Sequence, residues 1–191
     1  MITTTMNRIR HFPLTALFLF LALSPASPAQ AEDYSAKEIM AEVDSFFGGA
    51  TADLTKLVRG LTDKFGQPNA FITGSDKGAA IGAGLRYGKG KLKTKAGASR
   101  SVFWQSPSIG FDLGGSSSQV MSLVYNLGKA DDIYQRYPGV DGGVYFIGGV
   151  GATYNQLGKT VLATIRTGTG RRAGASAGYL KFSRDDTWNP F

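Results

Sequence analysis

The sequence predicts a mainly β protein, a small antiparallel β-barrel with two N-terminal α-helices packed on it. Apolar residues recur at helical spacing between positions 36 and 65. From Asn69 onward, short runs rich in Val, Ile, Tyr, Phe and Thr alternate with Gly, Ser, Asp and Pro, which is typical of antiparallel strands. Glycines are paired or nearly paired inside several of these runs, and such glycines indicate bends that allow a sheet to close into a barrel.

The first 31 residues have the pattern of an export signal. They contain Arg8 and Arg10 but no acid, then a mostly apolar block at 12–23, then Ala29-Gln30-Ala31. We therefore predict a signal peptide, residues 1–31, that is cleaved after Ala31. The apolar block is too short to cross the roughly 30 Å hydrocarbon core of a membrane. We expect a periplasmic mature chain without a transmembrane segment.

Residues 32–68 are expected to form an N-terminal helical segment. Ser35 and Glu38 have the spacing of a capping box, and Gly48-Gly49 ends the helix that follows. A second helix is predicted from five apolar residues that share one face: Leu54, Leu57, Val58, Leu61 and Phe65. Because this apolar face would be stable only when buried, we expect the helices to pack on the rest of the protein.

Residues 69–191 are expected to form the β-barrel domain. A short helix, Ala130 to Tyr137, is predicted to interrupt the strands before Pro138-Gly139. Glycines within the strands, such as Gly114-Gly115, mark expected bends or bulges. We predict strands at 69–74, 78–89, 90–95, 99–106, 108–115, 118–127, 142–155, 159–168 and 172–183.

The composition argues against an enzyme. The chain has no cysteine, and its one histidine, His11, lies in the predicted signal peptide. A mature chain without either residue cannot form a Ser-His-Asp or Cys-His nucleophile pair, a zinc site with His or Cys ligands, or a thiol redox centre. Asp112 and Asp141 remain as a conceivable hydrolytic carboxylate pair, whereas Asp131-Asp132 is better explained as the acidic start of the short helix. We predict no catalytic residue, metal or cofactor.

Charge is the most distinctive feature of the predicted barrel, since the whole chain has a net charge of +7. Lys89, Lys91, Lys93 and Lys95 alternate along one strand, and in extended backbone they project from one face. We call these four residues the lysine ridge. Arg171 and Arg172 are predicted to join it as ligand-binding residues, and Arg100 and Arg166 would extend it if their strands are neighbours. Such a ridge would attract an anionic lipid headgroup or polymer, or alternatively protect a free sheet edge from aggregation.

Several sequence blocks resemble a family of proteobacterial periplasmic proteins, the cell-envelope integrity protein A family. They are Gly66-Gln67-Pro68-Asn69-Ala70, Trp104-Gln105-Ser106-Pro107-Ser108-Ile109-Gly110-Phe111-Asp112, Leu123-Val124-Tyr125-Asn126-Leu127, Ile133-Tyr134-Gln135-Arg136-Tyr137-Pro138-Gly139-Val140 and Trp188-Asn189-Pro190-Phe191. The resemblance implies a small β-barrel and a role in keeping the envelope intact, without known catalytic residues. A weaker similarity, in the segments 108–115 and 148–151, is to the Ysc84-like lipid-binding domains.

These observations lead to one leading hypothesis and two alternatives. The leading hypothesis is a non-catalytic periplasmic protein that maintains envelope integrity by binding an anionic lipid, glycolipid or other envelope component. The partner is not expected to be nucleic acid, and contact with the membrane is expected to be peripheral. The alternatives are a carboxylate-dependent envelope glycan hydrolase and a scaffold that contacts only proteins.

Overall fold

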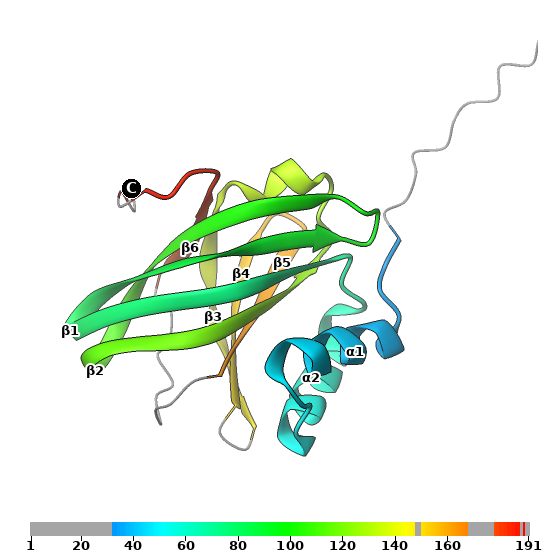
Figure 1. Ribbon diagram of the computed structural model, residues 1–191, viewed down its shortest axis with the longest axis horizontal. Helices are drawn as coiled ribbons and strands as arrows, with labels where there is room; N and C mark the ends of the chain where they lie inside the picture. The colour runs from blue at the N-terminus through cyan, green and yellow to red at the C-terminus, as the bar shows by residue number, and fades with distance from the viewer. Residues whose placement is uncertain (1–31, 148–149, 168–177, 188, 190–191) are drawn as a thin grey trace, which may run out of the picture. The chain divides into compact units, whose positions relative to one another are not determined.

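A computed structural model describes residues 32–147, 150–167, 178–187 and 189 of the chain (Figure 1). For residues 79–83, 108–116 and 141–147 it describes the backbone alone. The predicted signal peptide and the predicted ligand residues Arg171 and Arg172 lie outside the described residues. Among the described residues, no helix has the length and apolar character needed to span a membrane.

Both predicted helices are present. In α1 (Ala36–Phe47), the Glu38 backbone N–H donates to Ser35 Oγ at 3.3 Å, and the Ser35 backbone N–H donates to Glu38 Oε2 at 2.9 Å. This reciprocal pair is the predicted capping box. Gly48 ends the helix at φ 74°, in the left-handed region that favours glycine. Thr51 caps α2 (Ala52–Phe65) through its side chain.

The remaining elements form a closed antiparallel barrel of eight strands, which confirms the predicted fold class. Two long strands bend in the middle, so that each half serves as one strand of the barrel. In chain order, the elements after α2 are β1 (Ala70–Thr94), β2 (Ser99–Tyr125), the 3₁₀ helix η1 (Ala130–Ile133), β3 (Arg136–Ile147), β4 (Val150–Leu157), β5 (Thr160–Thr167) and β6 (Tyr179–Ser183).

The bend of the β1–β2 hairpin is visible in its register. Gly78 pairs with Ser116, and the next pair is Ala80 with Asp112, so β2 has two more residues than the pairing needs. Extra residues on one strand bend an antiparallel ladder and increase its twist. Figure 1 shows the hairpin running to one side and returning. The second half of β2 pairs with β5, and its first half pairs with β6.

The barrel closes where the two halves of β1 meet, at a contact that we call the seam. A Cβ atom added to Gly74 would lie 2.2 Å from the carbonyl oxygen of Lys89 and 2.7 Å from the Cα of Gly90. Only glycine permits backbone to approach backbone so closely. The Lys95 N–H also donates to the carbonyl of Asn69 at 2.9 Å, which joins the end of β1 to the residue before its start.

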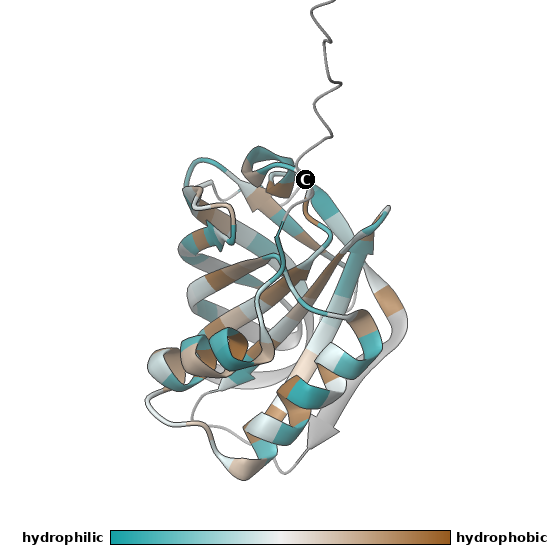
Figure 2. Ribbon diagram, turned by 90° about the vertical axis from the view of Figure 1, so that its right-hand side faces the viewer, coloured by the Kyte–Doolittle hydropathy of each residue, from teal (hydrophilic) through white to brown (hydrophobic). Residues whose placement is uncertain are grey.

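The strands separate two hydrophobic cores, because successive side chains point to opposite faces. Figure 2 shows the mixture of hydrophobic and hydrophilic residues along strands and helices. The barrel interior holds one core, with Ile72, Trp104 and Phe182 among its buried residues. The other core lies between the outer face and the helices, with Phe71 and Leu57 among its members. The helices therefore pack on the barrel, as predicted.

Charged contacts hold α1 against the second half of β1. Lys95 Nζ lies 2.5 Å from Glu38 Oε1, and Lys93 Nζ lies 3.6 Å from Glu42 Oε1. Lys95 also lies over the ring of Tyr34, 5.2 Å from its centroid. The two carboxylates are four residues apart and therefore share one face of α1. This face lies toward the lysine ridge.

The predicted element boundaries are wrong where strands continue or turn unexpectedly. The single strand β1 spans three predicted runs, 69–74, 78–89 and 90–95. In the same way, β2 spans the runs 99–106, 108–115 and 118–127. The glycines and serines between these runs bend the strands rather than end them, since backbone pairing continues on both sides of the bend.

The opposite error occurs in the predicted strand 142–155. It contains the end of β3 and most of β4, which pair as an antiparallel hairpin.

The predicted helix Ala130–Tyr137 is shorter than expected, because η1 ends at Ile133 and β3 begins at Arg136. Pro138 has no backbone N–H to donate, yet β3 pairs with β6 there, with Tyr137 opposite Leu180 and Pro138 opposite Tyr179. The predicted strand 159–168 is confirmed by β5.

Substitution of Gly74 by alanine is expected to lower the free energy of unfolding by about 1–3 kcal/mol, because the added methyl group overpacks the seam. Urea unfolding followed by circular dichroism measures this change. The control is Gly60→Ala in α2, where a Cβ meets nothing within 4 Å; there alanine should stabilise by about 0.5–1 kcal/mol. Equal effects of both substitutions would contradict the close contact at the seam.

Substitution of Glu38 by glutamine is expected to flatten the acid part of the pH–stability curve. The Lys95 ammonium, together with Ser35, lowers the pKa of Glu38 from 4.5 to about 2. Because the pKa is lower in the folded chain, the ionised carboxylate stabilises the fold above pH 4.5, and this contribution disappears as the pH falls toward 2. Urea midpoints measured across this range test the expectation. Lys37→Gln, a charge change on the same helix, should leave the slope unchanged.

Candidate anion-binding site on the outer face of the barrel

The lysine ridge lies on the second half of β1, with its side chains on the outer face of the barrel. Lys89, Lys91 and Lys93 are exposed and Lys95 is partly buried. Leu92, between them, is fully buried in the barrel interior. This alternation places the four lysines on one face, as the spacing predicts. Whether the ridge binds a ligand stays a prediction.

The ridge is divided into two halves by its contacts with α1. Lys93 and Lys95 have carboxylate partners in Glu42 and Glu38. Lys89 and Lys91 make no ion pair within the part of the chain that the structure describes, and both are exposed to solvent. An exposed ammonium group without an internal partner is available for an external anion. The candidate site is therefore the Lys89–Lys91 half of the ridge.

The alternative role, protection of a free sheet edge, also stays a prediction. Next to Lys89, the backbone of the second half of β1 contacts the first half at the seam. The Lys95 backbone N–H also donates to the carbonyl of Asn69, the residue before the first half of β1. A strand whose second side is covered by backbone does not present an edge for pairing with another chain.

A hollow of about 450 Å³ lies next to Lys89 on the outer face. Its floor includes the seam glycines, Gly74 and Gly90. Side chains from three elements surround it, and the paired residues of the β1–β2 hairpin supply most of them. They are Phe46 from the end of α1, Ser75 and Lys89 from β1, and Ser101, Phe103 and Gln119 from β2.

The register explains why these side chains meet. Ser75 is paired with Gln119 in the first half of the hairpin, and Lys89 is paired with Phe103 in the second half. Directly paired residues in an antiparallel ladder have side chains on the same face. The seam brings the two halves together, so that the four side chains gather around one hollow. This arrangement offers one cation, two phenyl rings when Phe46 is included, and uncharged hydrogen-bonding groups.

Arg166 and Arg100 do not extend the lysine ridge. Arg166 points into the barrel, where its Nε donates to Asp76 Oδ2 at 3.0 Å and its Nη1 donates to Thr153 Oγ1 at 3.2 Å. The Asp76 side chain is fully buried and also accepts from Arg86 Nη1 at 3.2 Å. The sequence pattern does not reveal this buried cluster, because Asp76 lies between two predicted strands, 69–74 and 78–89.

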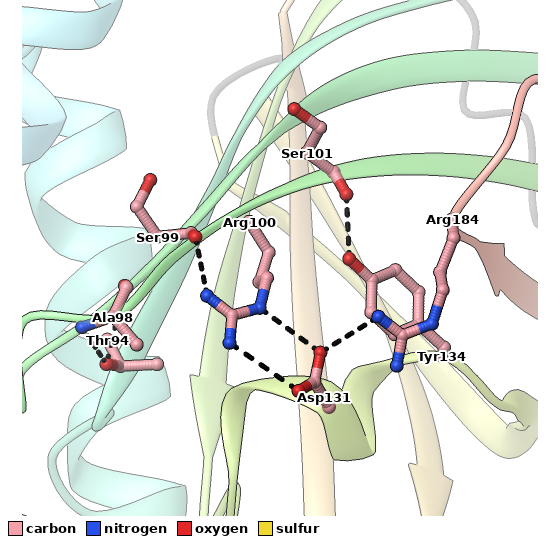
Figure 3. Close-up of polar contacts among 8 residues, drawn as sticks. All are labelled: Thr94, Ala98, Ser99, Arg100, Ser101, Asp131, Tyr134 and Arg184. Carbon is pink, nitrogen blue, oxygen red and sulfur yellow. Dashed lines mark hydrogen bonds and ion pairs between the residues drawn. The ribbon is translucent and has the colours of Figure 1, made fainter.

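Arg100 instead belongs to a surface cluster around Asp131 (Figure 3). Its Nε donates to Asp131 Oδ1 at 3.1 Å, and Arg184 Nη1 donates to the same oxygen at 3.1 Å. Hydrogen bonds and charge from Arg100, with a smaller contribution from Arg184, lower the pKa of Asp131. The Arg184 guanidinium also lies 4.2 Å from the ring centroid of Tyr134. These contacts fasten η1 to β2 and to the residue after β6.

The remaining predicted residues have separate outcomes. Asp132 accepts from the Lys129 backbone N–H at 2.7 Å, which confirms its role at the start of the short helix. The side chains of Asp112 and Asp141 lie outside the described residues, and so do Arg171 and Arg172. Within the described residues, no group of three or more His, Cys, Asp or Glu side chains gathers as a metal site would require.

Sequence reasoning identified the lysines of the site but missed the hollow beside them. Phe103 lies in a predicted strand and Phe46 in a predicted helix, and no spacing in the sequence relates the two residues. Their meeting depends on the fold of the hairpin and on the attachment of α1. The alternation of Lys89 and Lys91 was the one signal of this site that the amino-acid sequence contained.

Comparison with known proteins identifies relatives of this chain. Residues 32–191 match the family model described as envelope integrity protein A. A crystal structure of a β-barrel-like, uncharacterized protein from Brucella abortus is similar, with 42% sequence identity and a TM-score of 0.73. The similarity covers 83% of this chain and 99% of that chain.

A comparison with curated proteins finds no match. The similarity to the Ysc84-like domains stays a prediction, because none of these findings bears on it. The match to the family model extends over the whole described part of the chain, and the related crystal structure has the same barrel-like fold. The chain belongs to the envelope integrity protein A family.

Proposed function

We propose that this protein is a non-catalytic periplasmic protein that maintains envelope integrity by binding an anionic lipid or glycolipid of the envelope. The observation that carries this proposal is the division of the lysine ridge. Two of its lysines are paired with α1, whereas Lys89 and Lys91 are exposed and have no ion-pair partner among the described residues, and Lys89 lines a hollow. The family's name supports the role in envelope integrity.

The surface character of the described residues favours electrostatic attachment over insertion into a membrane. Only Val140 and Leu157 are exposed large hydrophobic residues in this part of the chain. Basic residues close to an anionic membrane each contribute about 1 kcal/mol of binding free energy. Contact through Lys89 and Lys91 would therefore be peripheral, and salt would weaken it.

The periplasmic location is supported by the pattern of the first 31 residues. The match to the family model begins at residue 32, immediately after the proposed cleavage site. The non-catalytic role is supported by the composition, since cysteine is absent and the one histidine precedes the proposed cleavage site. Binding of an envelope component requires neither residue.

The variant Lys89→Gln/Lys91→Gln should bind anionic vesicles roughly 30-fold more weakly than the unaltered protein at low salt, because two contributions of about 1 kcal/mol are lost. Co-sedimentation with vesicles of phosphatidylcholine and phosphatidylglycerol measures the binding. Vesicles of phosphatidylcholine alone should bind neither protein appreciably. Raising the salt concentration should reduce the difference between the two proteins.

The matched control is Lys129→Gln/Lys159→Gln, which removes the same charge from exposed positions away from β1. It should retain most of the binding to anionic vesicles. Equal losses in both variants would show that only the total charge matters and would remove Lys89 and Lys91 from the proposal. Absence of vesicle binding by the unaltered protein would favour the protein-only scaffold instead.

A further inference from the structure

We propose that the hollow beside Lys89 accommodates one acyl chain of an anionic phospholipid, with the lipid phosphate bound at Lys89. This inference rests on the proposed function but goes beyond it. Electrostatic attachment requires only a charged surface, whereas this inference assigns a pocket to one lipid molecule. The volume of about 450 Å³ lies within the range of about 300–1,000 Å³ that is typical of small-molecule sites.

The first argument is the apolar surface that the hollow leaves uncovered. Phe46 and Phe103 both line it, and each is only partly buried. The described surface otherwise exposes few large apolar side chains. Two partly exposed phenyl rings line this one concave place. Apolar surface of this kind is stabilised when a hydrocarbon group covers it.

The second argument is the charge at the rim of the hollow. Lys89 contributes an exposed ammonium group, and no carboxylate lines the hollow in the described part of the chain. Lys91 is paired in register with Ser101, which also lines the hollow, so a second cation lies on the same face. The hydroxyl groups of Ser75 and Ser101 and the amide of Gln119 are suitable donors for phosphate and glycerol oxygens.

Together these two properties select an amphiphile rather than a hydrophilic polyanion. A sugar phosphate or a polyphosphate would satisfy Lys89 but would leave both phenyl rings uncovered. A neutral hydrocarbon would cover the rings but would leave the cation without a counterion. An anionic phospholipid supplies both groups in one molecule.

The contacts of α1 explain how the hollow keeps its shape. Phe46 lies in the last turn of α1, and the ion pairs from Glu38 and Glu42 attach this helix to β1. Phe46 also packs against Phe47, with ring centroids 4.9 Å apart. The paired half of the lysine ridge therefore positions one wall of the hollow, while Lys89 remains available for the ligand.

Three soluble probes separate the contributions of the chain and the headgroup. The first is short-chain lysophosphatidylglycerol below its micelle concentration, the second is glycerophosphoglycerol, which lacks the acyl chain, and the third is lysophosphatidylcholine of the same chain length. Isothermal titration calorimetry should show one site per protein for the first probe. The second and third probes should each bind more weakly by roughly tenfold or more.

Two variants test the hollow itself. Phe103→Ala removes one wall, and Ser75→Trp fills the space from an exposed position. Both should weaken lysophosphatidylglycerol binding by roughly tenfold. Phe103→Ala should leave the affinity for glycerophosphoglycerol nearly unchanged. Leu157→Ala, which truncates an exposed apolar residue outside the hollow, is the control and should bind like the unaltered protein.

The proposal is overturned if lysophosphatidylglycerol and glycerophosphoglycerol bind equally well, or if Phe103→Ala and Ser75→Trp both fold correctly by circular dichroism and bind the lipid with unchanged affinity. Such a result leaves the proposed function standing, provided that Lys89→Gln/Lys91→Gln still weakens the attachment to anionic vesicles. Loss of both effects would reject the pocket and the electrostatic attachment together.

Discussion

The close backbone contact between Gly74 and Gly90 sets the position of both halves of β1. It joins the two halves of β1, and this joint closes the barrel. Asn69 secures the same place, since its side chain bonds to the backbone of Leu127 at 2.8 and 3.1 Å while its carbonyl accepts from Lys95. The start of β1, its end and the end of β2 are thereby held together. Side chains larger than hydrogen at the two glycines would separate them.

Closure of the barrel also determines what each face of β1 does. The inward residues fill the interior core, and the outward residues either pack under the helices or carry charge. Because α1 brings two carboxylates to the outer face, it neutralises one half of the lysine ridge and leaves the other half to solvent. The same lysine spacing thus serves two purposes. One pair of lysines contacts a helix, and the other pair faces outward, with Lys89 at the hollow.

The buried charges of the interior and the surface cluster around Asp131 are best understood as parts of the fold. Asp76 joins β1 to β5 through Arg166, and Asp131 joins η1 to β2 through Arg100. Each carboxylate already has two guanidinium partners. Neither is therefore placed as a free acid or base for hydrolysis. Among the described residues, these clusters account for arginines that sequence spacing alone would have added to the ridge.

Residue spacing is sufficient to predict the local features of this protein. The capping box at Ser35, the apolar face of α2 and the alternation of the four lysines follow from residue spacing within one helix or strand. The bend of the long hairpin, the pairing of particular lysines with α1, and the position of Phe46 and Phe103 around one hollow depend on tertiary contacts. The physical reason is sequence distance: a hydrogen bond or apolar contact between residues from different elements leaves no periodic pattern in either of them. The site is made of such contacts, so its cations were predictable and its hollow was not.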